Sequence, residues 1–114
     1  MNSQSRRDLV RDYKEQKILA GVYAVRCEVS GETWVAGVRN VGSQQNKLWF
    51  GLRTGGHPNK AMQAAWIAHG EAAFAFEVVE TIDDETLSPI GLADQIKARE
   101  RHWLATLGAT KAVG

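Results

Sequence analysis

Residues 21–37 constrain the fold more strongly than any other stretch of this sequence. Two short runs of alternating apolar residues, one carrying Tyr23 and the other Trp34, flank the pair Ser30-Gly31. Alternation with a period of two is the pattern of a half-buried β-strand, and a Ser-Gly pair between two such runs is typical of a β-hairpin. The sequence therefore predicts two adjacent antiparallel strands, against which the rest of the chain must pack.

The segments after the hairpin predict two helices, a strand and a closing helix. Ser43 and Ser88 are candidate N-caps, Pro89 suits a first helical position, and Gly108 ends the last apolar repeat. The predicted helices span 44–53, 59–69 and 89–107, the strand spans 73–80, and the acidic stretch between strand and last helix is expected to be a loop. We expect a core that contains Leu48, Trp49, Leu52, Trp66, Phe76, Ile96 and Trp103.

The chain of 114 residues, 44% of them hydrophobic, is long enough for one compact domain and too short for two. Residues 3–17 place Leu9, Val10 and Tyr13 on one narrow stripe, which predicts a short N-terminal helix. The predicted fold is a single α+β domain over 1–114. It comprises a helical extension over 1–19 and a core over 20–107, in which helices flank a small three-stranded antiparallel sheet.

Fourteen basic and thirteen acidic residues give a formal charge of +1, which excludes a strongly basic nucleic-acid binder but leaves room for a local basic face. Cys27 is the only cysteine, so neither an intramolecular disulfide nor a cysteine metal cluster can form. The sequence contains no apolar run of the length that a membrane span needs and no apolar signal-peptide core at its start. We expect a soluble, cytoplasmic protein.

Glu100 breaks the pattern of the last predicted helix. On a helical wheel it falls within the apolar stripe that contains Leu92, Ile96 and Trp103. One interpretation is a carboxylate at the margin of the stripe that reaches solvent or pairs with a cation such as Arg99. The other is a partly buried metal ligand or acid, because burying a charge is costly unless a cation compensates it.

The hairpin resembles a known family. Gly21-Val22-Tyr23, ten residues and then Trp34-Val35-Ala36 are similar to the paired motif that names the GIY-YIG nucleases, and Ala98 to Leu104, with Glu100 before Trp103-Leu104, is similar to the third motif of that family. The resemblance covers residues 20–107. It implies that Glu100 holds a single divalent metal, Mg²⁺ or Mn²⁺, and that Tyr23 orients or deprotonates the attacking water or donates a hydrogen bond.

The sequence departs from the family at several positions. Trp34 stands where the family has its second tyrosine, and Ala36 stands in place of a glycine, although Gly37 follows. The catalytic arginine of the family falls on Gln44, which can donate a hydrogen bond but cannot neutralise a phosphate. Trp34 lacks a phenolic oxygen, so it is a stacking wall for a base or a core residue. The candidate catalytic residues are therefore Tyr23, Trp34, Gln44 and Glu100.

Three functions remain open. The first is a metal-dependent endonuclease that hydrolyses DNA phosphodiester bonds with weakened activity, the second is an inactive nucleic-acid-binding module on the same fold, and the third is a protein-interaction domain. DNA, single- or double-stranded, is the expected partner, and the near-neutral charge predicts weak binding. His57 is similar to a loop histidine of homing-type members, or is a solvent-exposed turn residue. The candidate nucleic-acid-binding residues are Arg39, Lys47, Arg53, His57 and Lys60.

Overall fold

A computed structural model of the chain describes residues 19–82 and 87–112. The predicted helix over 3–17, and with it nearly all of the predicted extension, lies outside the described residues, as do residues 83–86 of the predicted acidic loop. None of the helices in the described ranges combines the length and the apolar character that a bilayer span requires.

The predicted hairpin is present. β1 (Ala20–Cys27) and β2 (Thr33–Val38) pair antiparallel, with Tyr23 opposite Ala36. Gly31 in the connecting turn has φ 79°, a left-handed conformation that glycine adopts without strain. The turn is closed by the N–H of Cys27, which donates to the carbonyl of Glu32 over 2.9 Å.

The sheet has one strand more than the sequence predicted. β3 (Phe74–Ile82) pairs antiparallel with β1, and β4 (Thr110–Lys111) pairs parallel with β2, which gives the order β3-β1-β2-β4. The three predicted strands are present and antiparallel, but the prediction of a three-stranded antiparallel sheet is wrong, because β4 makes the sheet four-stranded and mixed. Gly108, with φ 59°, turns the chain back toward the sheet after the last helix. A strand of two residues is too short to show an alternating pattern.

The helices follow their capping residues. They are α2 (Gln44–Thr54), α3 (Lys60–His69) and α4 (Pro89–Leu107), with single 3₁₀ turns at Val41–Ser43 and Glu71–Ala73. The side chains of Asn59 and Ser88 accept hydrogen bonds from the first turns of α3 and α4. Ser43 precedes α2 but makes no capping hydrogen bond, whereas Asn40 caps the 3₁₀ turn before it.

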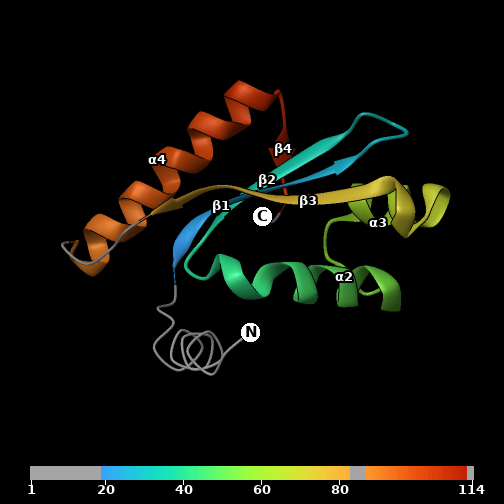
Figure 1. Ribbon diagram of the computed structural model, residues 1–114, viewed down its shortest axis with the longest axis horizontal. Coiled ribbons are helices and arrows are strands. Elements are labelled where there is room, and N and C mark those ends of the chain that lie inside the picture. Colours follow the sequence, from blue (N-terminus) through green and yellow to red (C-terminus); the bar gives the residue numbers. More distant parts are fainter. Residues whose placement is uncertain (1–18, 83–86, 113–114) are drawn as a thin grey trace, which may run out of the picture.

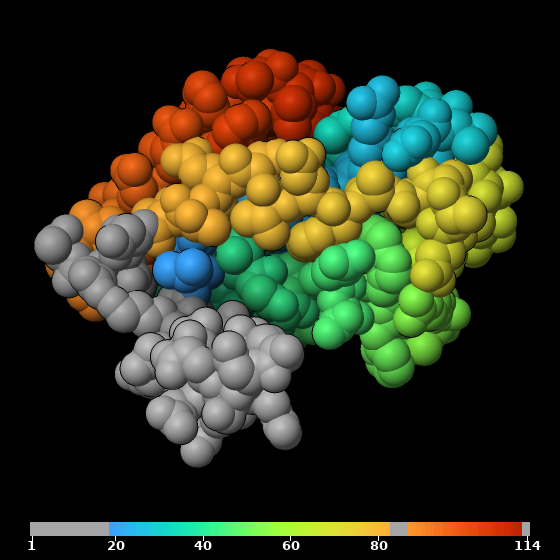
Figure 2. All heavy atoms as spheres, viewed as in Figure 1, coloured from blue at the N-terminus to red at the C-terminus, as the bar shows by residue number. Residues whose placement is uncertain are grey.

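Helices cover both faces of the sheet, α4 on one side and α2 with α3 on the other (Figure 1). Alternate residues of β1 and β2 face the two layers: Tyr23 and Trp34 pack in the α2 and α3 cluster, whereas Val22 and Val35 pack toward α4. β3 forms one edge of the sheet and is visible as a band between the layers (Figure 2). Of the predicted core residues, those buried are Leu48, Trp49, Leu52, Trp66 and Ile96, while Phe76 and Trp103 are half-buried against the core.

Candidate active site

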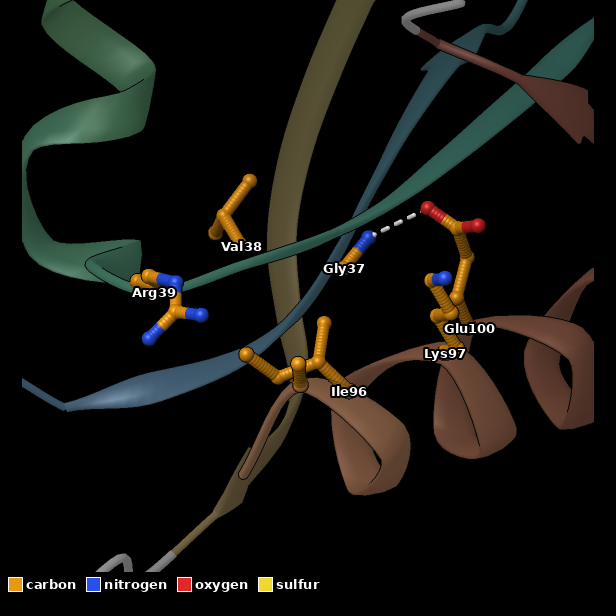
Figure 3. A pocket seen from close by; sticks show the side chains of 7 residues that line it. Gly37, Val38, Arg39, Ile96, Lys97 and Glu100 are labelled. Carbon is orange, nitrogen blue, oxygen red and sulfur yellow. Dashed lines mark hydrogen bonds between the residues drawn. The ribbon is translucent and has the colours of Figure 1, made fainter. Parts of the chain in front are cut away.

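Glu100 lies where α4 packs against β2. Its Oε2 accepts a hydrogen bond of 2.8 Å from the backbone N–H of Gly37 (Figure 3). β4 pairs only with Trp34 and Val35, so the outer edge of β2 is open at Gly37 and its N–H is available to a side chain. Arg99, the cation that the sequence offered as a partner for Glu100, instead pairs with Glu80 over 2.8 Å. The strand backbone, and not Arg99, thus satisfies one oxygen of the Glu100 carboxylate.

Gly37 is needed for this contact because a side chain would not fit. A Cβ at this position would lie 2.7 Å from Ile96 Cγ2, 3.0 Å from the Ile96 carbonyl oxygen and 3.2 Å from Glu100 Cβ. Ala36 carries its Cβ on the opposite face of the sheet, in the α2 and α3 cluster. In β2 the glycine with a steric reason is therefore Gly37, one position after the place where the sequence resemblance expects it.

A hollow of about 310 Å³ opens beside the carboxylate. Its lining includes two cations, Arg39 from the end of β2 and Lys97 from α4, which Figure 3 shows around Ile96 and Glu100. We call it the Arg39 hollow. Arg39 was a predicted nucleic-acid-binding residue. Lys97 was not predicted, although it precedes Glu100 by three residues and so lies on the same face of a helix, which the sequence could have indicated.

Tyr23 and Trp34 lie in the core on the α2 and α3 side of the sheet. They are 1% and 2% exposed, and their rings stack on Phe76 and Phe74 with centroids 5.0 Å and 6.1 Å apart. Burial, and secondarily the negative charge of Glu100, raises the pKa of Tyr23 to about 12. The phenol is therefore protonated at neutral pH, where it can donate a hydrogen bond but is a poor base.

Tyr23 and Glu100 come from different layers. The Tyr23 side chain belongs to the α2 and α3 side, whereas Glu100 comes from α4. Tyr23 pairs across the sheet with Ala36, and Glu100 bonds to the backbone of Gly37, the next residue, so β2 is the element that they share. Of the four candidate catalytic residues, Glu100 alone lines the Arg39 hollow.

Gln44 does not line the Arg39 hollow. It is the first residue of α2, and its Nε2 donates a hydrogen bond of 3.0 Å to the carbonyl oxygen of Asn40. Among the cations that line the hollow, Arg39 is the one closest to Gln44 in the sequence. The fold therefore places the cations of Arg39 and Lys97, and not Gln44, in the hollow that Glu100 lines.

The other predicted nucleic-acid-binding residues lie on α2, on α3 or between them. Arg53 donates two hydrogen bonds of 2.9 Å and 2.8 Å to the Glu71 carboxylate, which raise the pKa of Arg53 and lower that of Glu71. Lys47 and Lys60 are exposed on α2 and α3. His57 is half-buried, its Nδ1 accepts a hydrogen bond from the N–H of Asn59, and burial lowers its pKa.

The residues at Glu100 fit a hard divalent cation held mainly by water and substrate. Within residues 19–82 and 87–112 no group of three or more histidine, cysteine or acidic side chains could enclose a metal. Mg²⁺ commonly needs only one or two carboxylates, because it keeps several waters and binds substrate phosphates. Glu100 can supply one such ligand, since the described chain gives a hydrogen bond to Oε2 and none to its second oxygen.

The sequence matches no protein-family model and no curated protein. Two solved structures share its fold. One is a point mutant of the catalytic domain of intron endonuclease I-TevI, with a TM-score of 0.65, 20% identity, and coverage of 80% of this chain and 86% of that chain. The other is the catalytic domain of homing endonuclease I-TevI, with a TM-score of 0.64, 21% identity, and coverage of 78% and 88%.

This chain has a GIY-YIG-like fold. The sequence resemblance predicted that fold, and the structural similarity confirms it. Because the identity is so low, the similarity establishes topology, and the chemistry must be argued from the residues of this chain.

Proposed function

We propose that this protein is a metal-dependent endonuclease that hydrolyses DNA phosphodiester bonds in the Arg39 hollow. The observation that carries the proposal is the Glu100 carboxylate, fixed on the N–H of Gly37 in a hollow that is also lined by the cations of Arg39 and Lys97. The GIY-YIG-like fold, shared with an endonuclease domain, supports it.

Glu100 would act as the metal-binding residue. The hydrogen bond from Gly37 orients its carboxylate, and the packing of α4 on β2 holds its stem in place. A bound Mg²⁺ or Mn²⁺ supplies positive charge to the phosphate and to the leaving oxygen. The second carboxylate oxygen is the one we assign to that metal.

Arg39 and Lys97 would hold the phosphate. Both line the hollow, Arg39 directly after β2 and Lys97 on α4, and within residues 19–82 and 87–112 neither side chain forms an ion pair. Positive charge placed where negative charge develops commonly contributes about a hundred- to a thousand-fold in rate. We assign to Arg39 the charge that Gln44 cannot provide.

Tyr23 would contribute from within the core. Its side chain is 1% exposed in the α2 and α3 cluster and is not among the residues that line the Arg39 hollow. Because its raised pKa makes the phenol a poor base, hydrogen-bond donation is the role that we keep for Tyr23 among those that the sequence left open.

A nucleic-acid-binding module without cleavage is the second candidate. The observation in its favour is Gln44, which stands in place of an arginine and is bonded to Asn40 outside the hollow. If Arg39 does not compensate, the protein would bind DNA and leave it intact.

The cleavage of labelled DNA in Mg²⁺ and in Mn²⁺ tests the proposal. We expect wild-type protein to cleave and the variant Arg39→Gln to cleave about a hundred-fold more slowly. Arg53→Gln is the matched control, because it removes the same charge from a side chain that is tied to Glu71. Absence of cleavage by wild-type protein in both metals, with DNA binding retained, would favour the binding module.

A further inference from the structure

We propose that a second hollow, which adjoins the first at Lys97 and Glu100, binds a neighbouring phosphate of the nucleic-acid strand, so that the strand crosses α4 at Glu100. This second site rests on the proposed function, because it extends the same substrate beyond the scissile phosphate. Its ligand is a phosphodiester group of DNA.

The second hollow has a volume of about 330 Å³ and is lined by Lys97, Glu100, Arg101, Leu104 and Lys111. We call it the Lys111 hollow. It shares Lys97 and Glu100 with the Arg39 hollow, so the two hollows adjoin at these residues of α4. A strand whose scissile phosphate lies in the Arg39 hollow would place an adjacent phosphate in the Lys111 hollow.

The charges of the Lys111 hollow favour an anion. Three cations line it against the single carboxylate of Glu100. None of the three forms an ion pair within the described part of the chain, in contrast to Arg53 and Arg99, which are paired with Glu71 and Glu80. A concentration of unpaired cations in a hollow focuses positive potential there, although the chain as a whole carries a charge of only +1.

Two rigid elements fix these cations. Lys97 and Arg101 are one helical turn apart on α4, about 6 Å along its axis. Lys111 belongs to β4, which pairs with β2, and the Nδ2 of Asn59 donates hydrogen bonds of 3.1 Å to the carbonyl oxygens of Lys111 and Ala112. The Lys111 backbone is therefore anchored to the sheet and to α3, and the hollow is preformed.

This location differs from the one that the sequence indicated. Lys47, Arg53 and Lys60 lie on α2 and α3, across the sheet from α4. If DNA binds through the Lys111 hollow, it contacts the α4 side of the molecule; if it binds through the cations that the sequence indicated, it contacts the α2 and α3 side. A pair of double variants with the same loss of charge can distinguish them.

The test is the salt dependence of DNA binding, measured by the anisotropy of a short fluorescent DNA strand in EDTA between about 50 and 200 mM salt. One phosphate contact contributes about 0.7 to 0.9 to the slope of log Kd against log salt. We expect Arg101→Gln/Lys111→Gln to lower the slope by that amount and to weaken binding about tenfold at the lowest salt. The matched control Lys47→Gln/Arg53→Gln should leave the slope unchanged.

The experiment tests phosphate binding in the Lys111 hollow independently of the proposed function. DNA binding is measured without a divalent metal, and DNA cleavage is measured in a parallel assay. An unchanged slope in Arg101→Gln/Lys111→Gln, an equal fall in the control, or no binding by wild-type protein would each overturn the second site, whatever the cleavage result. A fall in slope confined to Arg101→Gln/Lys111→Gln supports it, even if the wild-type protein proves unable to cleave. All four substituted side chains are exposed, and circular dichroism confirms that the variants fold.

Discussion

Replacing Gly37 with alanine should separate α4 from the sheet. The new Cβ would lie 2.7 Å from Ile96 Cγ2 and 3.0 Å from the Ile96 carbonyl oxygen. The methyl group can rotate away, but the carbonyl belongs to the helix backbone, so α4 itself must move. Overpacking of this kind costs about 1–3 kcal/mol. For a domain of this size, each kcal/mol lowers Tm by about 4 °C, so we expect Tm to fall by about 4–12 °C.

Gly51→Ala is the matched control. Gly51 lies inside α2, and a Cβ there would make ordinary contacts with His57 at 3.5 Å and 3.8 Å. Alanine in place of glycine within a helix should stabilise the protein by about 0.5–1 kcal/mol. Urea unfolding of both variants measures the difference, and the two changes should have opposite signs. A Gly37→Ala protein as stable as wild type would refute the close packing that positions Glu100.

Three further changes test other parts of the structure. Glu80→Gln should cost about 1 kcal/mol of unfolding free energy, because the Glu80 carboxylate accepts hydrogen bonds from Trp103 and Arg99, which lower its pKa. The carboxylate contributes this stability above the ordinary glutamate pKa of about 4.3 and loses it as the pH falls through the lowered pKa, which urea unfolding at several pH values measures. Trp66→Ala should cost about 3–5 kcal/mol in the same assay, since Trp66 is 8% exposed and packs against Trp49 and Phe74. Tyr23→Phe should abolish the loss of stability that wild-type protein shows above about pH 10, where the phenol ionises in the unfolded chain before it does in the folded one; urea unfolding at alkaline pH measures this.

The sequence was informative wherever structure is local. Alternation around Ser30-Gly31 predicted the hairpin, the candidate cap Ser88 predicted the start of α4, and the helix predicted from residue 59 begins one residue later, with Asn59 as its cap. Strand β4 carried no such signal, because its two residues pair with β2 only after Gly108 has turned the chain. That strand depends on tertiary contacts, which periodicity does not report.

The site was less predictable than the fold. The helical wheel marked Glu100 as unusual, and spacing could have placed Lys97 beside it, but its partner Gly37 and the approach of Arg39 and Lys111 from other elements did not follow from spacing. Arg53 fitted the pattern of a nucleic-acid-binding residue, yet the fold places it against Glu71. Which cations are free and which are paired is decided by contacts between segments far apart in the sequence. The metal, the partner and the cytoplasmic location stay predictions.

The most direct test of the central claim is Mg²⁺-dependent DNA cleavage by Glu100→Gln beside wild-type protein. Glutamine keeps the size of the side chain and can still accept a hydrogen bond from Gly37, but it lacks the charge that would hold a metal. We predict that the wild-type protein cleaves DNA in Mg²⁺, and that Glu100→Gln binds DNA with similar affinity in EDTA and cleaves it at least about a hundred-fold more slowly. Equal cleavage by the two proteins would contradict the assignment of Glu100 as the metal-binding residue.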